Sequence, residues 1–475
     1  MVHGMDPGEW AEWKKGARRI AQKNRELHSL RCDTEYKLQV GRRMRDEPEF
    51  FFPHNLDFRG RAYPMHPHLN HLGNDMCRGL LLFKDAKKQG ARGFDWMRVH
   101  LANLYGGGAD KFPFDGRVQF AMDHLDDIRD SAENPVHGRR WWLGADRPFQ
   151  CLATCMEIIA AIDSGNPEEY ESSLPVAQDG SCNGLQHYAA LGRDLGGGRA
   201  VNLTPQDRPA DVYTGIADLV AKKVKKDAVK GSHMEFANYL LGNVDRKLVK
   251  QTVMTSVYGV TFIGAREQIG NRLKERGWED DDQIYKTSCY AARITLQSLH
   301  TMFRSAKDIM GFLSHCAKAV AMQNHPVAWV TPLGLPVVQP YRNIKKHQVR
   351  TLMQRLVVVE SNDSLPVAKV KQRSAFPPNY IHSIDSTHMM MTAMECHRQG
   401  VAFAGVHDSF WTHSGSVEEM NVILRDQFIR LHGQPLLEQL LEHLDNLYPD
   451  VDLPGMPALG KLDLEEVRSS PYFFN

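Results

Sequence analysis

Two aspartates occupy positions from which their carboxylates could hold metal ions. Asp179 directly follows a short apolar strand predicted at 174–178 and enters the glycine-rich segment 178–187 (QDGSCNGLQH). Asp408 follows His407 in a tight turn between two further short strands. Strand ends and tight turns hold side chains rigidly, and two such carboxylates can bind two Mg²⁺ ions for in-line phosphoryl transfer. Taken singly, each aspartate is more often a turn residue or a helix cap.

A third segment places two cations, a methionine and a tyrosine four residues apart, at Arg246, Lys250, Met254 and Tyr258. On a helix this spacing forms one slowly turning stripe about 18 Å long, comparable to an extended nucleoside triphosphate. The cations suit phosphates, and the other two side chains suit a base and a sugar. In isolation the same pattern also fits an amphipathic helix with a basic end.

The elements expected around these segments predict a helix-rich α+β fold. One long basic helix is expected at 9–45, and short strands with turns are expected at 51–67. The remaining pattern predicts helices over most of 96–162 and 197–322, a β-hairpin at 328–341, and a strand pair at 401–406 and 410–413.

Composition indicates an ordinary globular protein of 475 residues, 42% of them hydrophobic and 24% charged. No apolar run approaches the roughly 20 residues of a membrane span. The net charge of +1 argues against a dedicated nucleic-acid binder. Basic residues nevertheless gather at 14–45 and 342–373, and acidic residues at 123–133 and 438–452. This separation fits either a channel for a polyanion or two solvated faces.

The cysteine and histidine spacings disfavour a zinc site or a disulfide framework. The eight cysteines include no C-x-x-C pair, which indicates a reducing compartment. His66, His68 and His71 lie close together in the sequence, but their spacing matches no familiar zinc pattern. Residues 1–10 contain two acidic residues and no arginine, so we expect no targeting segment in this chain.

The three segments, in this order, resemble motifs A, B and C of the single-subunit, phage-type DNA-dependent RNA polymerases, and the details look most like the mitochondrial members. The segment 57–61 (DFRGR) resembles the family's D-x-x-G-R element, which lies against the template and hybrid. The segment 378–383 (PNYIHS) resembles its P-N-[FY]-[IV]-H-S element. Residues 332–341 and the basic stretch after them are similar to its specificity loop, and 472–475 (YFFN) resembles its aromatic C-terminus.

The resemblance implies two-metal catalysis. Asp179, Asp408 and the Gly180 carbonyl would hold two Mg²⁺ ions, and His407 would support the primer end or the metal site. Residues expected to bind the incoming ribonucleotide are Arg246 and Lys250 at the triphosphate, with Met254, Tyr258, Gly184 and His382 at the base and sugar. The nucleic acid would lie against Asp57, Arg59, Gly60 and Arg61.

Three positions favour ribonucleotides over deoxynucleotides. Related DNA polymerases carry a glutamate where this chain has Gly184, and a glycine leaves room for the 2′-hydroxyl. Those enzymes also usually carry glutamate at the position of Ser409 and phenylalanine at that of Met254. A DNA polymerase of this superfamily, or a nucleic-acid-binding relative that has lost catalysis, are the alternatives. Loss of Asp179, Asp408 or Lys250 would mark the inactive relative, and all three are present.

The architecture that the resemblance implies is a right hand. The expected division is 1–45 as the end of an otherwise missing thumb, 46–196 as palm with a helical insertion, 197–381 as fingers with the specificity hairpin near 332–373, and 382–475 as the rest of the palm. Because relatives are about twice as long, we expect a fragment. Expected partners are a DNA template, an RNA transcript, ribonucleoside triphosphates and organellar initiation factors, for a monomer in mitochondria or, alternatively, plastids, without membrane contact.

Overall fold

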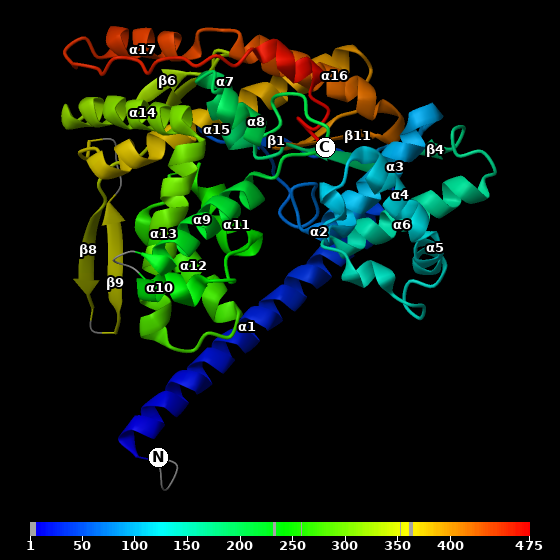
Figure 1. Ribbon diagram of the computed structural model, residues 1–475, viewed down its shortest axis with the longest axis horizontal. Helices are drawn as coiled ribbons and strands as arrows, with labels where there is room; N and C mark the ends of the chain where they lie inside the picture. The colour runs from blue at the N-terminus through cyan, green and yellow to red at the C-terminus, as the bar shows by residue number, and fades with distance from the viewer. Residues whose placement is uncertain (1–5, 231–233, 258, 352, 361–363) are drawn as a thin grey trace.

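The computed structural model describes residues 6–230, 234–257, 259–351, 353–360 and 364–475. Helices dominate this described part of the chain, and they surround a few small sheets (Figure 1). The prediction of a helix-rich α+β fold is therefore confirmed.

The central sheet has three antiparallel strands in the order β10–β11–β5. Its strands are β5 (Pro175–Asp179), β10 (Ala404–Val406) and β11 (Ser409–His413). Every residue of β11 is buried, as are the three middle residues of β5, which explains why β5 reads as an apolar run instead of alternating. The sheet thus presents a rigid edge from which polar side chains can project at the strand ends.

One long helix, α15 (Lys369–Arg398), lies behind this sheet in the main core. It packs against α7 (Asn183–Leu191), α14 (Arg304–Met322) and α16 (Val417–His432). The predicted boundary between fingers and palm at 381/382 falls inside α15, which continues without a break. The segment 378–383 therefore lies within this helix, and all six of its residues are buried.

A second core lies under the helices that precede β5. Its helices are α3 (Gly90–Tyr105), α4 (Phe114–Asp123), α5 (Leu125–Glu133) and α6 (Pro148–Asp163), with the short 3-10 turns η1 (Ala109–Lys111) and η2 (Trp141–Gly144) between them. These helices match the predicted helical stretch at 96–162, with the expected interruptions near Gly108 and Gly138.

The helical region that follows is also found where it was predicted. It consists of α8 (Leu195–Ala200), α9 (Val212–Val229), α10 (Met234–Leu240), α11 (Arg246–Ser256), α12 (Phe262–Glu275), α13 (Asp281–Met302) and α14. Helices α9 to α13 form one block in Figure 1, and their inner faces join the main core.

Two hairpins follow this block. The predicted hairpin at 328–341 is found as β6 (Ala328–Val330) and β7 (Pro336–Val338). The second hairpin consists of β8 (Lys345–Arg350) and β9 (Arg355–Glu360) and lies within 332–373, the range in which the resemblance implies the specificity hairpin. It extends beside the α9–α13 block as an isolated ribbon, and all but one of its strand residues are exposed (Figure 1).

The predicted basic helix is α1 (Pro7–Met44), which projects away from the rest of the chain as a single rod (Figure 1). Because most of its residues are exposed, local interactions must support much of it. Asp6 and Glu9 form a capping box at its start, and Lys37 pairs with Asp33 one turn earlier at 2.5 Å.

The remaining elements are short. They are β1 (His54–Leu56), β2 (Ala62–Pro64), α2 (Asp75–Gly79), β3 (Lys87–Lys88), β4 (Glu171–Ser172), η3 (Ser414–Ser416), α17 (Leu436–Leu447) and η4 (Leu464–Ser469). Within the described residues, no helix has both the length and the apolar character that crossing a bilayer requires.

Candidate active site

Asp179 and Asp408 lie next to each other at one end of the central sheet. Asp179 is the last residue of β5, and Asp408 lies in the two-residue turn between β10 and β11. The sheet register pairs Asp179 with Ser409, and the Gly180 amide donates a hydrogen bond to the Asp408 carbonyl at 3.0 Å. The structure thus brings together two residues that are 229 positions apart in sequence (408 − 179).

The C-terminal tail holds the backbone of Asp179 from the other side. The Asn475 amide donates to the Asp179 carbonyl at 3.1 Å, and the Asp179 amide donates to the Asn475 carbonyl at 3.2 Å. The Asn475 side chain in turn accepts a hydrogen bond from Arg117, whose guanidinium is fully buried. Sequence reasoning noted the aromatic tail but found no signal for this pairing, because backbone contacts leave no pattern of residue types.

The surroundings of the Asp408 carboxyl disfavour its ionised form. Protein atoms are dense around it, although the residue itself is exposed to solvent. This loss of hydration, and then the charge of Asp179, raise its pKa, while Arg61 and Arg78 oppose the shift. Two carboxylates that repel each other in this way form a natural site for divalent cations.

The two oxygens of the Asp179 carboxylate have different surroundings. Oδ1 is buried and has no hydrogen-bond partner among the described residues. Oδ2 lies 3.3 Å from Nη2 of Arg147, the residue immediately before α6. A buried carboxylate oxygen without a protein partner is open to a bound water or cation, which would compensate its lost hydration.

The donor set suits a hard divalent cation. No three His, Cys, Asp or Glu side chains gather into a metal-binding group in the part of the chain that is described. Two carboxylates and the nearby Gly180 backbone provide hard oxygen donors, which Mg²⁺ prefers alongside water and substrate phosphates.

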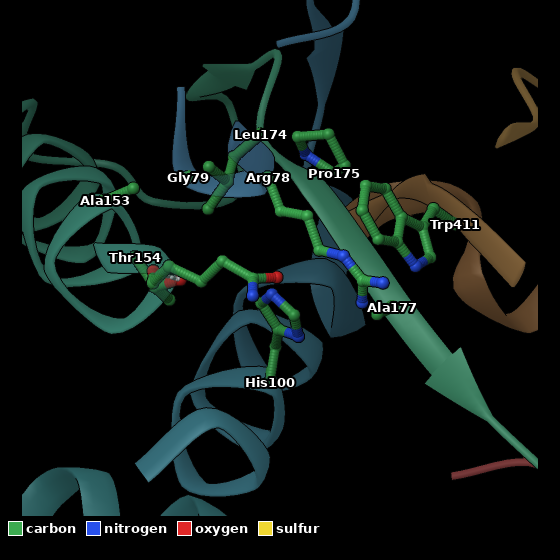
Figure 2. Close-up of a pocket in the computed structure, with 10 residues that line it drawn as sticks. Arg78, Gly79, His100, Ala153, Thr154, Leu174, Pro175, Ala177 and Trp411 are labelled. Atoms are coloured by element: carbon green, nitrogen blue, oxygen red, sulfur yellow. Dashed lines mark hydrogen bonds between the residues drawn. The ribbon is translucent and has the colours of Figure 1, made fainter. Parts of the chain in front are cut away.

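A small cavity lies beside the part of β5 that precedes Asp179. Its lining includes Ala177 and Trp411 (Figure 2). Arg78 extends into this region with its guanidinium 5.5 Å from the Trp411 ring, and it donates to the Gly73 carbonyl at 3.0 Å. His100 lines the same cavity, and burial followed by the charge of Arg147 lowers its pKa to about 4. Arg78 therefore adds positive potential behind the two aspartates without an ion pair to either.

Helix α11 carries three of the four residues of the predicted stripe. The Asp245 side chain caps it by accepting from the Leu248 amide at 2.9 Å. Arg246 forms an ion pair with Asp211 at 2.7 Å, while Met254 is 45% exposed. Tyr258 lies outside the described residues.

Lys250 is exposed on α11 in a region of positive potential. Partial burial, and then the charges of Arg246 and Lys111, lower the pKa of its ammonium group. Lys111 lies at the end of η1, on the helical segment before β5, and it forms an ion pair with Asp110 at 2.9 Å. Sequence reasoning missed Lys111, because nothing local indicates that its charge acts on Lys250.

The segment 57–61 forms a tight turn around one carboxylate. Oδ1 of Asp57 accepts from the amides of Arg59 and Arg61 at 2.9 and 3.0 Å. Gly60 has φ +100°, which favours glycine, and a Cβ there would come within 3.2 Å of Leu335 and Ser386.

Both arginines of this turn reach helix α15. Arg59 donates to Nδ1 of His382 at 2.6 Å, and Arg61 pairs with Asp385 at 2.5 Å. Burial, and then the charges of Arg61 and Arg59, lower the pKa of His382 to about 2, so its ring is neutral. Asp385 is the partner that sequence reasoning missed.

His407 and Gly184 complete the predicted set. His407 has φ +56°, and its ring meets Tyr63 edge-on at 4.7 Å. Burial, the largest of several causes, lowers the pKa of His407 to about 4, which leaves the ring neutral near pH 7. Gly184 is buried in the first turn of α7, five residues after Asp179.

Comparison with known proteins decides the family. The family model for DNA-dependent RNA polymerase matches residues 87–451, more than three quarters of the chain. The chain belongs to the DNA-dependent RNA polymerase family. This finding confirms the resemblance to single-subunit, phage-type polymerases.

Plant organellar polymerases are among the similar proteins. The mitochondrial DNA-directed RNA polymerase 1B of Nicotiana tabacum is 55% identical over 475 residues, covering 99% of this chain and 47% of that protein. The chloroplastic/mitochondrial polymerase 2 of Arabidopsis thaliana is 53% identical (99% and 47%), and the chloroplastic polymerase 3 of Nicotiana sylvestris is 53% identical (100% and 49%). The polymerase chain thus spans about half the length of the relatives it matches.

Proposed function

We propose that this chain is the catalytic region of an organellar DNA-dependent RNA polymerase. It would add ribonucleotides to an RNA 3′ end on a DNA template. The observation that supports this most directly is the adjacency of Asp179 and Asp408 at the sheet end, in a chain of this family.

The two aspartates and the Gly180 carbonyl would hold two Mg²⁺ ions. When bound, the ions supply charge neutralisation at the α-phosphate and make the attacking 3′-hydroxyl easier to deprotonate. The protein contributes rigid placement, because the strand ends and the tail fix the backbone of Asp179 on two sides. Burial, and then repulsion from Asp179, raise the pKa of Asp408, and a bound cation would relieve the repulsion.

Helix α11 would bind the incoming triphosphate. Lys250 is exposed for a phosphate contact, and Lys111 strengthens the positive potential around it. Arg246 is held by Asp211 and would orient the same phosphates from its fixed position. Met254 and Tyr258 would contact the base and sugar.

Selection of ribose would depend on Gly184, Tyr258 and His382. Because Nδ1 of His382 accepts from Arg59, the ring proton is assigned to Nε2, and that nitrogen would donate to the 2′-hydroxyl. Because the pKa of His382 is low, its ring stays neutral over the working pH range. The absence of a side chain at Gly184 leaves space for the same hydroxyl.

The turn at 57–61 and His407 would contact the nucleic acid. The network around Asp57 and α15 holds Arg59 and Arg61 in fixed orientations, which suits repeated contact with a moving template and hybrid. His407, neutral and next to Asp408, would support the primer end. The palm would comprise 46–196 and 382–475, the fingers 197–381, and α1 the end of the thumb.

The names of the relatives place them in mitochondria, chloroplasts or both, so we propose an organellar location, with mitochondria preferred. Organellar initiation factors would be partners of the full protein, and the catalytic region would act as a monomer.

Extension of an RNA primer on a preassembled RNA–DNA scaffold with Mg²⁺ tests this proposal. Ribonucleotide extension that Asp179→Asn abolishes would support it. Preferred use of deoxynucleotides would indicate a DNA polymerase, and scaffold binding without extension by the folded chain would indicate an inactive relative.

A further inference from the structure

Arg147 is anchored where two helices meet beside the aspartates. Its amide donates to the Leu104 carbonyl at 3.1 Å, near the end of α3. Its own carbonyl accepts from the Cys151 amide at 2.9 Å, in the first turn of α6. The backbone is therefore fixed, and only the side chain is free to move between partners.

That side chain contacts one of the two carboxylate oxygens that Asp179 offers to the proposed metal site. Nη2 of Arg147 lies 3.3 Å from Oδ2 of Asp179, and the side chains are 39% and 43% exposed. Among the described residues, Arg147 is the only basic residue within ion-pair distance of Asp179 or Asp408. The other nearby guanidiniums have different carboxylate or carbonyl partners, Asp385 for Arg61 and the Gly73 carbonyl for Arg78.

We propose that Arg147 is a built-in competitor for the metal ion at Asp179. In the metal-free protein its guanidinium neutralises Asp179, and a divalent ion must displace it to reach Oδ2. This inference rests on the proposed function, because it takes Asp179 to be a metal ligand.

The geometry limits the size of the effect. Mg²⁺ binds carboxylate oxygens at about 2.0–2.1 Å, and an oxygen held by a guanidinium has to exchange one partner for the other. Because both side chains are partly exposed, the contact is weak, and its removal should tighten metal binding by roughly two- to fivefold. Arg147 would therefore set the metal concentration at which the site loads, and it would leave the identity of the ligands unchanged.

Direct Mn²⁺ binding tests the proposal without relying on activity. The free Mn²⁺ signal is followed by electron paramagnetic resonance during titration of the wild-type chain, Arg147→Met and Asp179→Asn. Arg139→Met is the matched control, since Arg139 is exposed in the loop between α5 and η2 and pairs with Asp127 at 2.8 Å. Thermal melting confirms that each variant is folded.

The expected result is an Asp179-dependent site that binds Mn²⁺ two- to fivefold more tightly in Arg147→Met and unchanged in Arg139→Met. Half-maximal primer extension should also shift to lower Mg²⁺ in Arg147→Met. Unchanged or weaker Mn²⁺ binding in Arg147→Met, with the site still lost in Asp179→Asn, would overturn the inference and leave the proposed function standing. Mn²⁺ binding that does not depend on Asp179 at all would overturn both.

Discussion

The guanidinium of Arg61 and the carboxylate of Asp385 form a two-point ion pair across 324 positions of the chain, with Nε–Oδ1 at 3.1 Å and Nη2–Oδ2 at 2.5 Å. The pair fastens the 57–61 turn to α15. Burial raises the pKa of Asp385 to about 6, and the charge of Arg61 opposes this shift. The two side chains are 13% and 2% exposed, so the pair is largely desolvated.

Breaking this pair should cost considerable stability. Asp385→Ala removes the carboxylate beside a buried guanidinium, and we expect the free energy of unfolding to fall by about 3 kcal/mol. Urea denaturation measures the change. Glu395→Ala is the control on the same helix, because its partner Arg398 is 72% exposed and the expected loss is much smaller. Equal losses in the two variants would contradict a special role for the buried pair.

Acid should destabilise the fold through buried histidines. His388 donates from Nε2 to the Leu424 carbonyl at 2.8 Å, and burial lowers its pKa from 6.5 to about 4. The unfolded chain therefore binds the proton more readily, and stability is lost as the pH falls from about 6.5 towards 4.

His388→Gln keeps a donor but cannot titrate. Between about pH 7.5 and about pH 5.5, the wild type should lose about 1.4 kcal/mol more unfolding free energy than the variant. Urea midpoints at the two pH values measure this difference. Parallel losses would mean that His388 is not responsible.

Lys250→Met should weaken use of the incoming nucleotide. Loss of one charge-assisted phosphate contact is expected to reduce kcat/KM roughly 10- to 100-fold on the preassembled scaffold. Lys247→Met is the matched control, since Lys247 is an exposed lysine on the same helix with no predicted role. A similar decrease in both variants would point to general electrostatics instead of a specific contact.

Local sequence patterns were enough to predict most helices and strands and the order of the site residues along the chain. Periodicity, and turn residues near Asp179 and Asp408, predict the ends of β5 and β10, the helices around α11 and the first hairpin. The residue pattern alone did not indicate the strands of the second hairpin, because they are exposed on both faces and β8 shows no buried alternation.

The contacts that tune the site could not be predicted. Arg147 meets Asp179, Asn475 pairs with Asp179, and Asp385 meets Arg61 only because distant segments pack together. Such contacts depend on tertiary geometry, which residue types and spacing do not specify. The helical continuity of α15 through Pro377 and Pro378 was also not expected, since proline removes a backbone donor.

Tyr258→Phe should weaken discrimination against deoxynucleotides. The hydroxyl is the part of this side chain expected to sense the sugar, and its removal leaves the ring for stacking. A competition assay with mixed ribo- and deoxynucleotides on the scaffold measures the ratio incorporated. An unchanged ratio would remove Tyr258 from sugar selection.

The central claim is that Asp179 and Asp408 together form the catalytic metal site. The most direct measurement compares scaffold binding and primer extension for the wild type and Asp408→Asn, which keeps the side-chain shape and removes the charge. We predict that Asp408→Asn binds the scaffold as the wild type does and extends the primer at least about 100-fold more slowly, because one metal-binding carboxylate is gone. Extension at a wild-type rate by the folded variant would contradict the assignment.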